Sequence, residues 1–129
     1  MIIKTPIPKI EIERPSKDLI KRLQGIGSAT ASGELRKLGI KAAAIDGLRS
    51  FVPGVSIVGP AITLQYLPKR EDQYPEGEYR EPESQVHRHA LYHAQAGDII
   101  VVDGRGEITS GVFGEMMLTY LKGRGGLGI

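Results

Sequence analysis

The stretch of the sequence best suited to chemistry is residues 97–117, GDIIVVDGRGEITSGVFGEMM. It predicts a strand at 99–102, then a glycine loop, then a helix over 110–122. In open α/β sheets, ligands collect beyond the carboxyl ends of strands. The first amides of a helix that starts there lack partners inside the helix and favour an anion such as a carboxylate or a phosphate. The amides in question are those of Gly114, Glu115, Met116 and Met117. An ordinary strand-to-helix connection has the same pattern and is the simpler interpretation from pattern alone.

Two carboxylates lie near this loop. Asp103 comes directly after the predicted strand, where catalytic or metal-binding carboxylates are often found. An Asp before a Gly also makes a turn, and the pattern favours the turn. Glu115 falls in the first turn of the predicted helix, where a carboxylate stabilises the helix dipole whatever else it does. We therefore place Asp103 at the edge of a possible pocket.

The three histidines of the chain lie close together in HRHALYH, as His87, His89 and His93. His89 and His93 are four residues apart on a predicted helix over 86–94, so both could reach one zinc ion. The pattern lacks the Glu that follows the first His in zinc proteases, and no third ligand is evident by spacing. A solvated helix face or a subunit contact is the simpler interpretation, and the roles of the three histidines stay open.

The glycines of residues 123–128, GRGGLG, match the spacing Gly-x-Gly-x-x-Gly. A dinucleotide-binding loop of that spacing follows a strand and opens a helix. Here the pattern follows a predicted helix, so it indicates a helix stop at Gly123 and the start of another strand at 127–129. Because that strand is only begun, we expect the 129 residues to be the N-terminal part of a longer protein.

Other classes of site are excluded by what the sequence lacks. It has no cysteine, which excludes disulfides, thiolate metal sites and cysteine nucleophiles. It has neither a Gly-x-Ser-x-Gly nucleophile elbow nor a P-loop. Its net charge of +2 is too small to indicate a nucleic-acid partner. It has no apolar run of the ~20 residues that a membrane helix needs and no secretory signal, so we expect a cytoplasmic protein without a membrane partner.

The length of 129 residues and the content of 40% hydrophobic residues predict one globular domain of the α/β class. Residues 1–15 hold three prolines and predict an extended arm. Ser16 and Ser28 are the expected N-caps of two short helices. The second of these helices ends at Gly39, with Leu35 and Leu38 turned inward.

A strand and an insert complete the prediction. Residues 54–68 alternate in a way typical of a strand, and Gly59-Pro60 indicates a bulge or an edge position. Residues 69–84 are polar and predict a surface insert that covers something or simply faces solvent. The apolar run at 99–102 is typical of a strand buried on both faces.

Three segments together resemble one known family. Residues 97–129, ATASGELRKLGI and VPGVSIVGPAITLQYLP, with Gly-Pro-Ala-x-Thr at 59–63, resemble the RraA-like family in order and spacing. That family includes regulators of RNase E activity and 4-hydroxy-4-methyl-2-oxoglutarate aldolases. The resemblance covers about residues 25–129 and implies a swivelling β/β/α domain with N-terminal helices, incomplete at its C-terminus. It also implies a homotrimer or homohexamer with the pocket between subunits.

The resemblance further implies how an aldolase of this family binds its substrate. The Gly-Glu-x-x segment, here Gly114 to Met117, lends backbone amides to the carboxylate of pyruvate. An Arg-Asp pair further along binds the oxo acid and a divalent ion, usually Mg²⁺. Arg124 is followed by Gly and does not match that pair. We therefore expect the catalytic residues beyond residue 129 and no metal ligand within 1–129.

Two functions follow as hypotheses. The first is a metal-dependent aldolase that cleaves a 4-hydroxy-2-oxo acid to pyruvate. The alternative is a non-catalytic regulator that acts by contact with an RNase E-like protein. The sequence itself names neither the exact substrate nor the metal.

Overall fold

The computed structural model describes residues 10–68, 72 and 85–129. It divides into two compact units. Ser16–Val58 form the helical unit, and Met1–Pro15 with Gly59–Ile129 form the sheet unit. The predicted insert at 69–84, apart from Asp72, and the first nine residues of the predicted arm lie outside the described residues. That residues 1–129 form a single domain stays a prediction.

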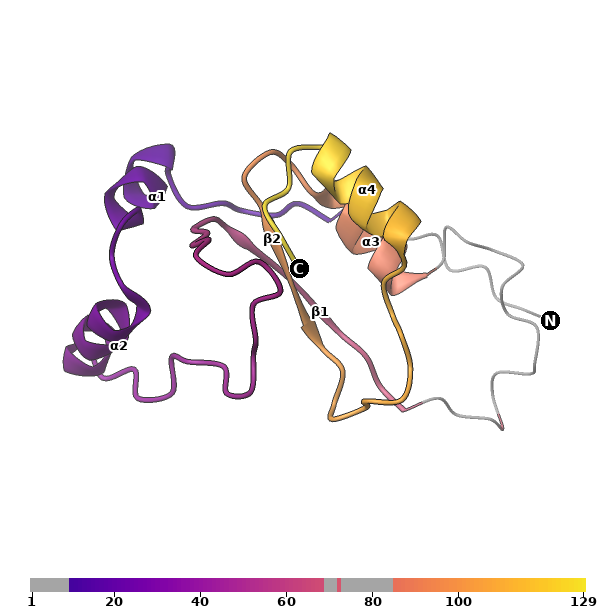
Figure 1. The fold of residues 1–129 in the computed structure, drawn as a ribbon, viewed down its shortest axis with the longest axis horizontal. Coiled ribbons are helices and arrows are strands. Elements are labelled where there is room, and N and C mark those ends of the chain that lie inside the picture. Colours follow the sequence, from indigo (N-terminus) through magenta and orange to yellow (C-terminus); the bar gives the residue numbers. More distant parts are fainter. Residues whose placement is uncertain (1–9, 69–71, 73–84) are drawn as a thin grey trace. The chain divides into compact units, whose positions relative to one another are not determined.

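The sheet unit is built on two parallel strands, β1 (Ala61–Gln65) and β2 (Ile99–Asp103) (Figure 1). Their register runs from Ala61 opposite Ile99 to Gln65 opposite Asp103. The ladder continues at its carboxyl end, where the Tyr66 N–H donates to the Asp103 carbonyl at 2.9 Å. A parallel pair needs a long crossover, which here contains a helix. The predicted α/β class is confirmed.

Two helices cover one face of this sheet. Helix α3 (Val86–His93) packs against β1, and α4 (Glu115–Gly123) packs against α3 (Figure 1). Strand β1 alternates strictly, with the side chains of residues 62 and 64 buried and those of 61, 63 and 65 exposed. The buried hydrophobic core is one cluster consisting of Ile62, Leu64, Ala90, Leu91, Ala94, Ile100 and Leu121.

Both strand predictions need correction. The strand predicted at 54–68 is limited to Ala61–Gln65 and begins directly after Pro60, which has no N–H to donate to a ladder. The strand predicted to be buried on both faces has Ile100 as its one fully buried residue, because the described helices cover a single face.

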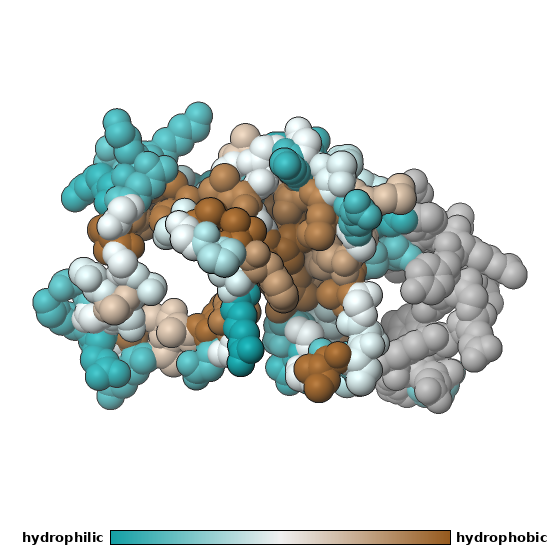
Figure 2. Space-filling model, in the orientation of Figure 1, coloured by the Kyte–Doolittle hydropathy of each residue, from teal (hydrophilic) through white to brown (hydrophobic). Residues whose placement is uncertain are grey.

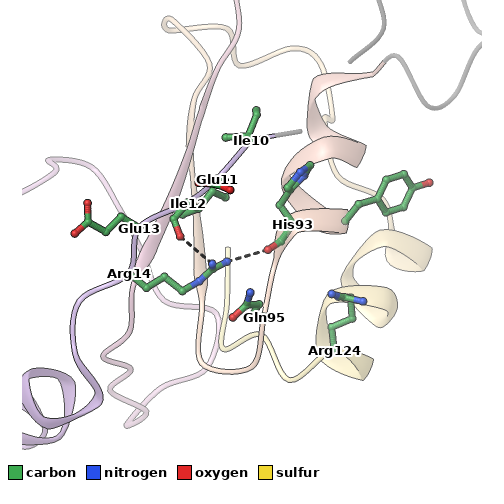
Figure 3. Close-up of a pocket in the computed structure, with 9 residues that line it drawn as sticks. Ile10, Glu11, Ile12, Glu13, Arg14, His93, Gln95 and Arg124 are labelled. Carbon is green, nitrogen blue, oxygen red and sulfur yellow. Dashed lines mark hydrogen bonds between the residues drawn. The ribbon is translucent and has the colours of Figure 1, made fainter. Parts of the chain in front are cut away.

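Within the sheet unit, an ion pair joins the described part of the N-terminal arm to the residue before β2, and its carboxylate is fully buried. Arg14 donates from Nη2 to Asp98 Oδ2 at 2.7 Å and from Nε to Oδ1 at 3.0 Å. Figure 3 shows the same guanidinium pointing to the carbonyl oxygens of Ile12 and His93, at 3.3 and 2.9 Å. Asp98, which looks like a turn residue in the sequence, is fully buried and also accepts from the Gln95 N–H at 2.8 Å.

The glycine-rich end of the chain closes α4 and leads back to the sheet. The Gly126 N–H donates to Leu121 O and the Gly125 N–H to Lys122 O, which is the Schellman arrangement. Gly125, with φ of 81°, is the left-handed residue, while Gly123 is the last helical one. Gly128 then forms a parallel bridge with Ile99, on the other side of β2 from β1. The predicted helix stop is confirmed, and the predicted strand start is present only as this single bridge.

The helical unit contains α1 (Lys17–Leu23) and α2 (Ser28–Lys37). The Ser16 side chain accepts from the Leu19 N–H at 3.2 Å, so the first predicted N-cap is confirmed. The second is wrong by one residue: Gly27 is the N-cap of α2 and contributes no side-chain hydrogen bond. Gly39, at φ of 88°, follows α2 as predicted, but Leu38 is 78% exposed rather than turned inward.

Candidate functional site

Helix α4 begins later than the sequence predicts. The sequence predicts a helix from residue 110, whereas residues 110–114 are not helical and α4 starts at Glu115. The N–H and the hydroxyl of Thr109 both donate to the carboxylate of Glu107, which holds this part of the segment in a local turn instead. Gly114 is the N-cap, with φ of −95° and ψ of 170°, and provides no side-chain cap.

The amides at the start of α4 are not all available to a ligand. The Met117 N–H already donates to the Gly114 carbonyl at 3.0 Å. Among the described residues, none accepts a hydrogen bond from the N–H groups of Gly114, Glu115 or Met116. A Cβ added at Gly114 would meet no atom within 4 Å, so the space beside the N-cap is open. Of the four amides predicted to bind an anion, three therefore have no acceptor among the described residues, and their role in binding stays a prediction.

The start of α4 also borders a shallow groove of about 400 Å³. Its lining consists of Glu115, Met116, Thr119 and Tyr120. The Met116 side chain is 87% exposed. An anion held by the amides would have an apolar surface next to it.

Asp103 lies at the carboxyl end of β2, as expected, and acts there as a turn residue. Its Oδ2 accepts from Gln65 Nε2 at 2.8 Å and its Oδ1 from the Arg105 N–H at 2.9 Å. The hydrogen bond from Gln65 first, and then that from Arg105, hold the pKa of Asp103 below its ordinary value. Arg105 takes a left-handed φ of 55° to close the turn. The interpretation of Asp103 as a turn residue is confirmed.

The histidines do not form a metal site with other side chains in the described part of the chain. His89 and His93 lie on one face of α3 with ring centroids 5.7 Å apart. His93 Nδ1 lies 2.9 Å from the His89 carbonyl oxygen, to which it donates in the matching tautomer. No group of three His, Asp or Glu residues able to hold a metal ion occurs among the described residues. The hypothesis of a zinc site gains no support.

His87 belongs to a different cluster, which the sequence analysis missed. Its ring lies 6.4 Å from the Tyr66 ring and 6.0 Å, edge-on, from the Phe113 ring. Tyr66 directly follows β1, and Phe113 directly precedes the N-cap of α4. The alternation that buries Ile62 and Leu64 also turns residue 66 to the same side of the sheet. This alternation is the sequence signal that could have placed Tyr66 in the cluster.

A second depression, of about 700 Å³, lies beside the arm (Figure 3). Residues 10–14, the end of α3 and Arg124 line it. Its two arginines already have partners in the protein, since Arg14 is paired with Asp98 and Arg124 Nε donates to the Ala94 carbonyl at 2.9 Å. This depression is therefore a weaker candidate for anion binding than the start of α4.

The arrangement of parallel strands, glycine loop and uncapped helix start can be compared with known proteins. Residues 28–129 match the model of the RraA-like family, described as Aldolase/RraA. The chain belongs to the RraA-like family. No curated protein matches the sequence.

One similar solved structure is that of RraAS2 from Streptomyces coelicolor, described as an unusual member of the RNase ES inhibitor RraA protein family. This RraA-like chain is 34% identical to it, with a TM-score of 0.76 over 90% of the present chain. It covers 52% of RraAS2, so it spans about half the length of that relative. In the part of the chain that the structure describes, no helix is long and apolar enough to cross a membrane.

Proposed function

We propose that this chain carries the carboxylate-binding half of an oxo-acid aldolase site. The observation that supports the proposal is the uncapped start of α4, where the amides of Gly114, Glu115 and Met116 have no acceptor among the described residues. They follow the carboxyl end of a parallel strand, where ligands of α/β proteins gather. A helix start of this kind binds a carboxylate through its N–H groups and its dipole.

Such a cradle suits the cleavage of a 4-hydroxy-2-oxo acid. The carbon–carbon bond breaks with its electron pair moving into the pyruvate portion, which becomes an enolate, while the 4-hydroxyl loses its proton and its carbon becomes the carbonyl of the second product. Amides that hold the adjacent carboxylate orient that portion and stabilise negative charge near it. The acceptor end of the substrate would lie toward the groove beside Met116. Proton transfer is not assigned to a residue of this chain.

The divalent ion, Mg²⁺ by resemblance, would stabilise the enolate charge. The described residues do not fit it, because they contain no group of three ligands and the Asp103 carboxylate already accepts from Gln65 and Arg105. We therefore derive no step through the metal. Its expected holder is the Asp of the family's Arg-Asp pair, and that pair does not occur in residues 1–129.

Pyruvate release from 4-hydroxy-4-methyl-2-oxoglutarate, measured in the full-length protein with Mg²⁺ and with EDTA, tests the activity. Gly114→Asp tests the cradle. An Asp N-cap accepts from the free amides and repels an anion, while it stabilises the helix by a few tenths of a kcal/mol relative to Gly. We expect pyruvate and oxalate binding to be lost without loss of stability.

Gly111→Asp is the matched control, because it adds the same charge in open space but away from the N-cap. It should bind pyruvate nearly as well as the unchanged protein. Equal binding by both variants would show that the amides at the start of α4 do not hold the carboxylate.

The second candidate is a regulator without catalysis. It is favoured by the description of RraAS2 as a member of an RNase ES inhibitor family. The regulator is favoured over the aldolase if the full-length protein inhibits an RNase E-type enzyme and releases no pyruvate with any divalent ion. In that case Gly114→Asp would leave the inhibition unchanged.

A further inference from the structure

Two of the three histidines share a face of α3 that the proposed function does not use. The ring centroids of His89 and His93 are 5.7 Å apart, and the two rings are tilted by 31° to each other. Both residues are partly exposed, so an ion from solvent can reach them. A divalent ion binds an imidazole nitrogen at ~2.0–2.1 Å. Rings this close therefore allow one ion to bind a nitrogen of each.

The hydrogen bond of His93 leaves its ring in the form that binds metals. Its Nδ1 lies 2.9 Å from the His89 carbonyl oxygen, and because that oxygen can only accept, Nδ1 carries the proton. In the neutral ring Nε2 then has the lone pair. Histidines that bind metals commonly donate their other ring N–H to a backbone carbonyl in this way, which fixes the ring and its tautomer. The bond also holds the His93 ring over the preceding turn of α3, on the side of His89.

The space beside the pair suits a cation. His93 also lines the depression of about 700 Å³ beside the arm, which gives water or a small anion room to complete the coordination of an ion (Figure 3). Glu11 and Glu13 bring negative charge to the same walls. The charge of Arg14 is offset by its ion pair. Among the described residues of this lining, the two carboxylates therefore stand against Arg124 as the one cation outside an ion pair.

The ligand chemistry selects the class of ion. Imidazole nitrogens suit Cu²⁺, Ni²⁺ and Zn²⁺, whereas Mg²⁺ prefers oxygen ligands. Zinc sites take three or four ligands from the protein, and no group of three occurs among the described residues. Cu²⁺ accepts a tetragonal arrangement of nitrogen and oxygen ligands and binds such sites more tightly than Ni²⁺ or Zn²⁺. His89 has a further interaction in the protein. Where that interaction uses the ring, an ion competes with it, which again favours the strongest binder.

We propose that His89 and His93 together bind a late transition-metal ion, Cu²⁺ more tightly than Ni²⁺ or Zn²⁺, with water in the remaining positions. The ion is held by two side chains of one helix and needs no residue beyond 129. The inference is independent of the proposed function, because this pair binds Cu²⁺ whether or not the protein cleaves an oxo acid.

Titration calorimetry of the full-length protein with Cu²⁺ tests the pair. The unchanged protein should bind one ion at this site, Ni²⁺ should bind more weakly, and Mg²⁺ should give no binding heat there. His89→Asn and His93→Asn each leave a single imidazole. Each should weaken Cu²⁺ binding by about tenfold or more, since even the loss of an outer partner of a metal ligand costs about 10–100-fold.

His87→Asn is the matched control. It removes an imidazole from the same helix, but one that packs between the rings of Tyr66 and Phe113. It should bind Cu²⁺ as tightly as the unchanged protein, and circular dichroism checks that all three variants are folded. An equal loss of affinity in His87→Asn would overturn the inference.

Electron paramagnetic resonance of the Cu²⁺-loaded, unchanged protein gives a readout that needs no variant. We expect coupling to two imidazole nitrogens, and coupling to one or none would overturn the inference. No binding by the unchanged protein, or binding as tight in His89→Asn or His93→Asn, would do the same and leave an adventitious ion only. A protein that binds Cu²⁺ through this pair but releases no pyruvate with Mg²⁺ supports the inference and counts against the aldolase alone.

Discussion

The sheet unit and the helical unit of this chain are ordered by different means. Every fully buried side chain in the described residues belongs to the sheet unit, including the charged Asp98. The helical unit has no buried residue. Its helices rest on local features, such as the Ser16 cap and the exposed pair between Lys37 Nζ and Glu34 Oε1 at 2.7 Å.

The difference shows that contacts between residues close in the chain can form helices, but that a buried core needs residues from distant parts of the chain. Helices of 7 and 10 residues are marginal in water without an apolar face to bury. The helical unit instead keeps large apolar side chains in solvent, with Phe51 99% and Leu48 75% exposed. Figure 2 shows hydrophobic patches beside hydrophilic side chains on this part of the surface. The two units should therefore respond differently to the same kind of substitution.

The largest difference is expected for ion pairs. Arg14→Met leaves the buried Asp98 carboxylate without its counter-charge, and breaking a buried pair from one side costs about 3 kcal/mol. Lys37→Met removes an exposed pair, for which the loss is about 0.5 kcal/mol. Urea denaturation and hydrogen exchange of the β2 amides measure the loss of stability in Arg14→Met. Hydrogen exchange of the α2 amides measures the loss in Lys37→Met. Equal losses would contradict the contrast between the units.

Glycine-to-alanine changes should have opposite signs in the two units. At Gly59 a Cβ would overlap the Gly97 carbonyl oxygen, so Gly59→Ala forces the two backbone segments apart and should destabilise the protein by about 2 kcal/mol. At Gly33, inside α2, a Cβ would meet no atom within 4 Å. Gly33→Ala should therefore stabilise its helix by about 0.5 kcal/mol. Thermal denaturation followed by circular dichroism measures the stability of both variants. A loss of stability in Gly33→Ala would show that α2 has close neighbours.

The smallest expected effect is a response of the sheet unit to acid. Burial raises the pKa of Asp98, but hydrogen bonds from Arg14 and the Gln95 N–H outweigh it and hold the pKa below its ordinary value. The resulting stability is present above the unfolded pKa of about 4 and is lost as pH falls through the folded pKa.

Urea midpoints measured across that acid range should fall, and Asp98→Asn should remove part of the fall. The remainder comes from Asp103 and Glu107, whose pKa values are also lowered, mainly by side-chain hydrogen bonds. An unchanged acid response in Asp98→Asn would exclude the buried pair as its source.

The sequence by itself determined the features that depend on neighbours a few residues away. The Ser16 cap, the turn at Asp103 and the stop after α4 follow from side chains and backbone within one turn of each other. The RraA-like motifs also identified the family that the comparisons show. They placed the candidate cradle at Gly114 to Met117, whose role as a binding site stays a prediction.

The tertiary structure alone decided which polar groups are buried and which amides remain free. Arg14 and Asp98 are 84 positions apart, and no local pattern pairs them. The unpartnered Tyr66 hydroxyl appears only once β1 packs beside α3. Burial and hydrogen-bond partnership depend on atoms brought together from distant parts of the chain, and local spacing carries no information about them.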